Sequence, residues 1–233
     1  MAMIGVLGGM GPLATVDFME RVVRLTEAAC DQEHLPMLVA NLPHTPDRSC
    51  AIIDGGPDPL PALLDGIEML NRNGVDLIVV PCNSAHHWYE QMRERSASPM
   101  LHIGSVSVAA VPSGVRRVAV LATGGALVSG FYQAELAARD IEPVVPDADT
   151  QRGIAACIAG VKAGDLDAAA AQLQSALHTL AARGVQAAVM GCTEIPLAAR
   201  RLAAPPFALV DSTLELARAT VSYALARGWN RPA

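Results

Sequence analysis

Residues 75–86 read Val-Asp-Leu-Ile-Val-Val-Pro-Cys-Asn-Ser-Ala-His, and residues 185–194 read Val-Gln-Ala-Ala-Val-Met-Gly-Cys-Thr-Glu. Each stretch is a short apolar run, typical of a buried strand, followed by a cysteine and small polar residues. Each also follows a glycine that ends an amphipathic helical pattern, over residues 60–71 and 166–183. A helix followed by a buried strand, found twice, predicts parallel sheets with helices on their faces.

The same alternation extends over the rest of the chain. Apolar runs over 3–7, 37–42 and 117–121 predict further strands, and patterns over 14–29, 128–139 and 213–227 predict helices. Leu121 lies 114 residues after Leu7, and Cys192 lies 110 residues after Cys82. We therefore expect two pseudo-symmetric α/β halves, joined between residues 96 and 112 and each carrying one cysteine at an equivalent strand end.

The bulk composition excludes several classes of protein. The 233 residues are 52% hydrophobic and 17% charged, with a net charge of −6 and no basic run, so no nucleic acid is expected as a partner. The odd number of five cysteines, without C-x-x-C, indicates reduced thiols and a cytoplasmic location. No uninterrupted apolar run is long enough for a membrane span, and the first residues lack the basic region of a signal peptide.

Cys82 and Cys192 are the candidate catalytic residues. Ligands of open α/β sheets bind beyond the carboxyl ends of the strands, where both cysteines are expected. The helix amino termini predicted there would bind carboxylates and lower a thiol pKa. Two thiols across a cleft suit racemisation, because one removes the α-proton and the other returns a proton to the opposite face. The alternative is that both are small core residues, the role we assign to Cys30, Cys50 and Cys157.

Two other classes of function fit single motifs. Residues 9–14, Gly-Met-Gly-Pro-Leu-Ala, match the G-x-G-x-x-A fingerprint of a dinucleotide-binding oxidoreductase. However, the second strand is followed by Pro43 and His44, with no acidic residue for a ribose hydroxyl. We expect the glycines instead to bring backbone close to a small substrate. A metal-binding module could use Cys82, His86 and Cys192, but the spacing is weak, and His86 is expected to support the Cys82 loop by hydrogen bonding.

Four segments together resemble the aspartate/glutamate racemase superfamily, and specifically its aspartate racemase branch. They are residues 8–15 (Gly-Gly-Met-Gly-Pro-Leu-Ala-Thr), 46–49 (Pro-Asp-Arg-Ser), 81–86 (Pro-Cys-Asn-Ser-Ala-His) and 191–194 (Gly-Cys-Thr-Glu). The likeness extends from residue 3 to about residue 223.

The resemblance implies a homodimer of two-domain subunits that racemises aspartate or glutamate in the cleft between the domains, without cofactor or metal. It places the final helix with the first domain, giving domains of 1–98 plus 209–233 and of 99–208. Asn83, Ser84, Thr123 and Thr193 would hold the α-carboxylate. Arg48 and Lys162 would face the side-chain carboxylate; from the residues alone, Arg48 offers a bidentate fork, but both could also be surface charges.

Departures from the family pattern concern substrate rather than mechanism. Ser84 stands where the family more often has Thr, and the segment after Thr123 lacks a further hydroxyl. Met10 and Glu194 line the predicted site where the glutamate-type branch has an acidic residue and a histidine, and both favour aspartate. Related cis-trans isomerases and hydantoin racemases also keep two cysteines, and they remain alternatives.

Overall fold

Two parallel sheets form the framework of the protein, which we describe from a computed structural model over residues 2–230. The first sheet has the order β2-β1-β3, and the second has the order β5-β4-β6-β7. All their pairings are parallel. The strands of the first sheet are β1 (Ile4–Gly8), β2 (Met37–Asn41) and β3 (Leu77–Val79). Those of the second are β4 (Arg117–Ala122), β5 (Glu142–Val144), β6 (Ala187–Gly191) and β7 (Ala208–Asp211).

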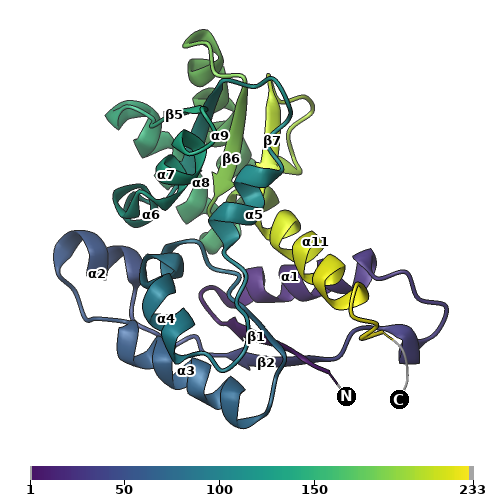
Figure 1. The fold of residues 1–233 in the computed structure, drawn as a ribbon. Helices are drawn as coiled ribbons and strands as arrows, with labels where there is room; N and C mark the ends of the chain where they lie inside the picture. The colour runs from purple at the N-terminus through teal and green to yellow at the C-terminus, as the bar shows by residue number, and fades with distance from the viewer. Residues whose placement is uncertain (1, 231–233) are drawn as a thin grey trace.

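Helices cover both faces of each sheet (Figure 1). In the first half of the chain they are α1 (Pro12–Leu25), the 3-10 turn η1 (Asp31–Glu33), α2 (Arg48–Asp54), α3 (Leu60–Arg72), the 3-10 turn η2 (Ser84–Trp88), α4 (Tyr89–Arg95) and α5 (Ile103–Ala109). In the second half they are α6 (Gly124–Ser129), α7 (Phe131–Ala137), α8 (Ala148–Ala163), α9 (Leu166–Ala182), α10 (Ile195–Ala199) and α11 (Ser212–Leu225). None of the helices within residues 2–230 is both long and apolar enough to cross a membrane.

Alternate strand residues divide the core into separate layers. Ile78 packs with α3 and α4, whereas Leu77 and Val79 on the opposite face pack with α1 and α11. In the second sheet, Leu121 packs with α8 and α9, and Val120 packs with α7 on the other face. This period-two alternation, with apolar side chains on both faces, is the property that buried parallel strands require.

The two halves repeat one another strand by strand. The central strands β1 and β4 correspond, as do the cysteine-bearing strand ends after β3 and β6, which lie beside them. The fourth strand of the second sheet, β7, also has a counterpart in the first half. Met100 makes a parallel bridge to Ile78 of β3, which is the position that β7 has beside β6. The predicted α/β class with two pseudo-symmetric halves is confirmed.

The helix after each fourth strand crosses to the other half. After Met100, α5 places Ile103 against the first sheet and Val108 against the second, where it packs beside α7. After β7, α11 leaves the second sheet and runs along α1 of the first half (Figure 1). Each half is therefore covered in part by a helix that follows the other half's sheet.

Some predicted boundaries were wrong. The helix predicted over 128–139 is two helices, α6 and α7, because Gly130 adopts a left-handed conformation with a φ of 72° between them. The helix predicted to reach residue 29 ends at Leu25, where Thr26 turns to an extended conformation. The domain division stays a proposal, with one change: the boundary before residue 209 falls inside β7, which pairs with β6, so we place it after Asp211.

Candidate functional site

A small cavity lies where the strand ends of the two halves meet. Its volume is about 30 Å³, which is space for roughly two water molecules. It is lined by Met10, Asp47, Arg48, Ser49, Cys82, Asn83, Ser84, Thr123, Lys162, Cys192, Thr193 and Glu194. All ten residues predicted for the site thus surround one cavity. Two further residues, Asp47 and Ser49, were not predicted, although both adjoin Arg48 in the motif that was quoted for it.

Cys82 follows β3 and is buried. Burial raises the pKa of the Cys82 thiol above its usual value, while the Arg48 guanidinium and the N–H of Ala85 favour the thiolate and oppose that rise. The expectation of a lowered pKa was wrong, because the desolvation of a buried thiolate outweighs the short 3-10 turn η2 that follows it. Arg48 is the cation that would stabilise this thiolate during a reaction.

Cys192 follows β6 and has an acidic neighbour instead of a basic one. Its Sγ donates a hydrogen bond to Glu194 Oε2 at 3.0 Å, and Thr193 Oγ1 donates to the same oxygen at 3.1 Å. Burial and this carboxylate raise the pKa of the Cys192 thiol well above its usual value, against the opposing influence of Lys162. The two cysteines therefore differ: a cation faces Cys82, and a proton-accepting carboxylate holds the hydrogen of Cys192.

Arg48 lies in the first turn of α2, and main-chain carbonyls fix its guanidinium. Nη1 donates to Thr45 O at 3.2 Å and to Pro46 O at 3.0 Å, and Nη2 makes a longer bond of 3.4 Å to Met10 O. Nε is buried and has no hydrogen-bond partner among the described residues. Nε and Nη2 share one edge of the guanidinium, the edge that suits a carboxylate, and the only bond on this edge is the long one from Nη2 to Met10 O.

The Asn83 side chain joins the two halves. Its Oδ1 accepts a hydrogen bond of 2.5 Å from Tyr132 Oη, and its Nδ2 donates to Ser212 Oγ at 3.1 Å. Ser212 Oγ in turn donates to Met190 O at 2.7 Å, two residues before Cys192. The amide predicted for the substrate carboxylate is thus largely occupied by protein, and it connects the segments that carry the two cysteines.

A pair of hydroxyl groups bridges the halves on the other side of the cavity. Ser84 Oγ lies 2.9 Å from Thr123 Oγ1, and Thr123 Oγ1 also accepts a hydrogen bond from the N–H of Ala126 at the start of α6. Beside them α2 and α6 pack tightly, since a Cβ added to Gly125 would lie 2.8 Å from Ser49 Cα. Glycine at this position permits the close approach that closes the cavity.

His86 supports the Cys82 loop through both ring nitrogens. Nε2 accepts a hydrogen bond of 3.1 Å from the N–H of Ile103, so Nδ1 carries the proton and donates it to Cys82 O at 2.9 Å. Burial and nearby His102 lower the pKa of His86 to about 3. With both nitrogens engaged, His86 has no lone pair for the metal site considered above, and the described residues contain no cluster of three potential metal-binding side chains.

The glycines that begin the chain's first motif are needed for contacts within the protein. A Cβ on Gly9 would lie 2.3 Å from the N of Leu42, and one on Gly8 would lie 2.4 Å from Thr15 Cγ2. Gly9 also has a φ of 93°, which favours glycine. For Gly9, the suggestion that the glycine brings backbone close to a small substrate was wrong, because neighbouring protein occupies the space. Gly11, by contrast, faces Glu194.

The thiols outside the cavity have varied settings. Cys157 is buried in the core of the second half, as a packing residue should be, and Cys50 is half-buried. Cys30 is exposed, so its assignment to packing was wrong.

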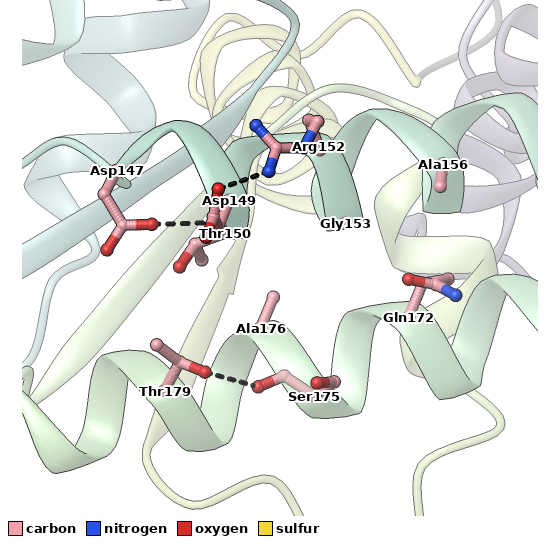
Figure 2. A pocket seen from close by; sticks show the side chains of 10 residues that line it. All are labelled: Asp147, Asp149, Thr150, Arg152, Gly153, Ala156, Gln172, Ser175, Ala176 and Thr179. Atoms are coloured by element: carbon pink, nitrogen blue, oxygen red, sulfur yellow. Dashed lines mark hydrogen bonds and ion pairs between the residues drawn. The ribbon is translucent and has the colours of Figure 1, made fainter.

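A larger hollow, of about 640 Å³, lies between α8 and α9 and is shown in Figure 2. Its charged groups are paired, Arg152 with Asp149 and Asp147 with Arg183 and the N–H of Thr150, and Thr179 donates to Ser175 O of its own helix. Neither a thiol nor an unpaired charge points into it from the labelled residues (Figure 2). The small cavity with the two cysteines is therefore the candidate site, although it is the smaller space.

Comparison with known proteins places the chain among racemases. The Asp/Glu/Hydantoin racemase family model matches residues 7–220. The chain is 29% identical over 228 residues to the broad specificity amino-acid racemase RacX of Bacillus subtilis, covering 96% of this chain and 99% of that protein. An aspartate racemase structure from Picrophilus torridus superposes with a TM-score of 0.83 at 30% identity, covering 96% of this chain and 94% of that one.

Structures with lower identity share the fold. A glutamate racemase, isoform RacE1 from Bacillus anthracis, superposes with a TM-score of 0.71 at 19% identity, covering 99% of this chain and 84% of that chain. The family match extends over most of the chain and includes both cysteine segments. The protein is thus an isomerase that belongs to the Asp/Glu/hydantoin racemase family.

Proposed function

We propose that the protein racemises an acidic amino acid, aspartate in preference to glutamate, with Cys82 and Cys192 as its two acid–base groups. The observation that carries the proposal is the cavity itself: both thiols line it together with Arg48, whose Nε is buried without a hydrogen-bond partner among the described residues. An acidic amino acid supplies a carboxylate for this Nε.

The chemistry requires one thiolate and one thiol at a time. In one direction the Cys82 thiolate, stabilised by Arg48, removes the α-proton while the Cys192 thiol donates its proton to the opposite face of the α-carbon. In the other direction the Cys192 thiolate that this turnover leaves removes the α-proton, while the Cys82 thiol donates its proton to the opposite face. Each turnover replaces the α-hydrogen with inversion at the α-carbon and exchanges the protonation states of the two sulfurs.

Charge that develops on the substrate's α-carboxylate needs donors. The Ser84 and Thr123 hydroxyl groups and the Thr193 hydroxyl group lie at the cavity, and we assign them to that carboxylate. Asn83 contributes through its main chain, because its amide is engaged with Tyr132 and Ser212. Fixed donors of this kind stabilise an oxyanion without reorganising in the transition state.

The side-chain carboxylate is assigned to Arg48, with Lys162 as the second cation. Met10, through its main-chain oxygen, holds the guanidinium, and its side chain closes the same wall. The relative in Bacillus subtilis is called a broad specificity racemase, and the structural relative from Picrophilus torridus is called an aspartate racemase. Those names support the reaction type for this chain, and the buried, unpartnered Nε of Arg48 supports the acidic substrate.

Independence from pyridoxal phosphate is part of the proposal. Such a cofactor binds through a lysine, and Lys162 is the one lysine in the sequence. Lys162 is exposed at the end of α8, beside two thiols that already supply both proton-transfer groups. A homodimer remains part of the proposal by family resemblance, and a cytoplasmic location remains part of it because of the odd number of cysteines without C-x-x-C.

The cavity is too small for an amino acid in the conformation described here. Substrate binding therefore requires the halves to separate, and the hydroxyl bridge and the α2–α6 contact are the places where they would part. Closure over the substrate would exclude water from the thiols.

Proton NMR in deuterated buffer tests the proposal directly. Pure protein is incubated with L-aspartate or D-aspartate without added cofactor. Exchange of the α-proton, together with loss of optical activity from either enantiomer, is the expected result. Absence of exchange with aspartate and glutamate would refute the acidic substrate, and conversion of a cis to a trans unsaturated diacid would then favour the isomerase alternative.

Four variants, one of them a control, test the residues. Cys82→Ala and Cys192→Ala should each abolish racemisation, whereas Cys30→Ala, which removes an exposed thiol, should leave it unchanged. Arg48→Ala should raise KM for aspartate far more than for alanine, which has no side-chain carboxylate. Full racemase activity in either cysteine variant would rule out the two-base mechanism.

A further inference from the structure

An apolar hollow adjoins the catalytic cavity on its outer side. Its volume is about 320 Å³, ten times that of the cavity between the cysteines. It is lined by the first turn of α1, the end of α8 and the start of α10, namely Gly11, Pro12, Leu13, Ala14, Val161, Lys162, Glu194 and Leu197. The hollow thus lies on the seam between the two halves, like the cavity.

The two spaces share a wall. Lys162 and Glu194 line both, and a Cβ added to Gly11 would lie 3.6 Å from Glu194 Oε1. Glu194 also holds the thiol of Cys192 through the same carboxylate group. An extended side chain on a substrate whose α-carbon lies beside that thiol would reach the hollow by passing between Lys162 and Glu194.

The chemistry of the hollow differs from that of the cavity. Pro12, Leu13, Val161 and Leu197 supply apolar surface, and Leu13, in the first turn of α1, is left 62% exposed. Apolar surface left exposed beside a site marks a place for an apolar ligand group. Arg48, the cation proposed to bind a side-chain carboxylate, lines the cavity and not the hollow.

We propose that this hollow is a second side-chain pocket, which admits amino acids with long apolar side chains, such as leucine and methionine, to the same two cysteines. The inference rests on the proposed racemase function and extends its substrates to another class. The reaction is unchanged: the α-proton goes to one sulfur, and the other sulfur supplies a proton to the opposite face. Glu194 at the rim of the hollow would repel a side-chain carboxylate. The hollow would therefore accept apolar side chains and exclude acidic ones, which bind at Arg48 instead.

Two variants on α1 test the pocket. Leu13→Asp places a charge in the hollow, and an acidic residue in the first turn of a helix is compatible with the fold. Val16→Asp is the matched control, because Val16 is 59% exposed on the same helix but does not line the hollow. The readout is α-proton exchange in deuterated buffer, measured as kcat/KM for L-leucine, L-methionine and L-aspartate.

The wild-type enzyme should exchange the α-protons of leucine and methionine. Leu13→Asp should lower kcat/KM for both by at least about tenfold, the discrimination typical of an apolar pocket, and change the value for aspartate less than about twofold. Val16→Asp should change none of them. Equal losses for leucine and aspartate in Leu13→Asp, or exchange of aspartate without exchange of leucine and methionine in the wild type, would overturn the pocket.

A binding measurement separates this proposal from the proposed function. Because Lys162 is the one lysine, reductive methylation with ¹³C-formaldehyde gives a single side-chain NMR signal at the hollow, distinct from that of the terminal amine. Leucine should shift this signal in the wild type and in Val16→Asp but not in Leu13→Asp. Such a shift without any proton exchange would refute racemisation and retain the pocket, whereas absence of a shift would refute the pocket.

Discussion

Replacing Arg21 by methionine should destabilise the protein strongly through a buried ion-pair network between the halves. Arg21 Nε lies 2.7 Å from Asp17 Oδ2, and its Nη1 lies 2.7 Å from Asp211 Oδ2, with all three side chains at most 14% exposed. Asp17 also pairs with Arg200 at the end of α10. The network therefore ties α1 to β7 and to the segment after Cys192.

The expected cost follows from the burial of the partners. Removing one member of a buried ion pair leaves an uncompensated charge and costs about 3–5 kcal/mol. We expect the lower end, about 3 kcal/mol, because Arg200 still pairs with Asp17 while Asp211 loses its cation. A cost of that size changes the unfolding equilibrium by roughly a hundredfold.

The same helix supplies a matched control. Arg24 Nε lies 2.7 Å from Glu20 Oε1, the same distance and the same i,i+4 spacing, but these side chains are 75% and 52% exposed. Arg24→Met should cost about 0.3–0.5 kcal/mol. Urea unfolding at neutral pH, extrapolated linearly to water, gives both free energies of unfolding. If Arg21→Met and Arg24→Met destabilise the protein equally, burial is not what gives the network its strength.

Three further variants test the groups around the site. Arg48→Met should raise the pKa of Cys82 further, because the nearby cation favours the thiolate. The midpoint of alkylation rate against pH, measured in the Cys192→Ala background, should move up, and an unchanged midpoint would show that Arg48 does not act on this thiol. Glu194→Gln should lower the pKa of Cys192, because the Glu194 carboxylate raises that pKa. The pH midpoint of alkylation, measured in the Cys82→Ala background, should move down, and an upward shift would show that Glu194 does not act on Cys192 in this way. Tyr132→Phe should lower the free energy of unfolding by about 1–3 kcal/mol, because Asn83 Oδ1 is left buried without its hydrogen-bond donor. An unchanged midpoint of urea unfolding would show that this bond contributes little.

The fold could be predicted because its signals are local. The strand before Cys82 and the strand before Cys192 are short apolar runs bounded by glycine, and the helices before them have clear amphipathic periods. The short helix α2 and the strand β7 gave no such signal, because each has few residues and mixed exposure. The break at Gly130 depends on one backbone conformation, which a helical pattern does not reveal.

The site could be predicted in its membership but not in its electrostatics. Equivalent positions at two strand ends indicated that Cys82 and Cys192 share a cavity. Their pKa values depend first on desolvation by burial, which results from the folded packing around each thiol and has no sequence pattern of its own. Likewise, the partners of Asn83 are Tyr132 and Ser212, which lie 49 and 129 residues away in the chain.

The crossing of α5 and α11 has a consequence for how such a chain could arise. Two half-length copies, each ending in a helix that packs on its neighbour, would form a two-fold dimer by exchanging identical elements. Joining the copies head to tail would give the strand order, the paired cysteines and the crossed helices seen in this single chain. In that dimer each thiol would face the identical thiol of the other copy across the symmetry axis. Only after fusion could the two positions diverge, so that one thiol acquired an arginine beside it and the other a glutamate.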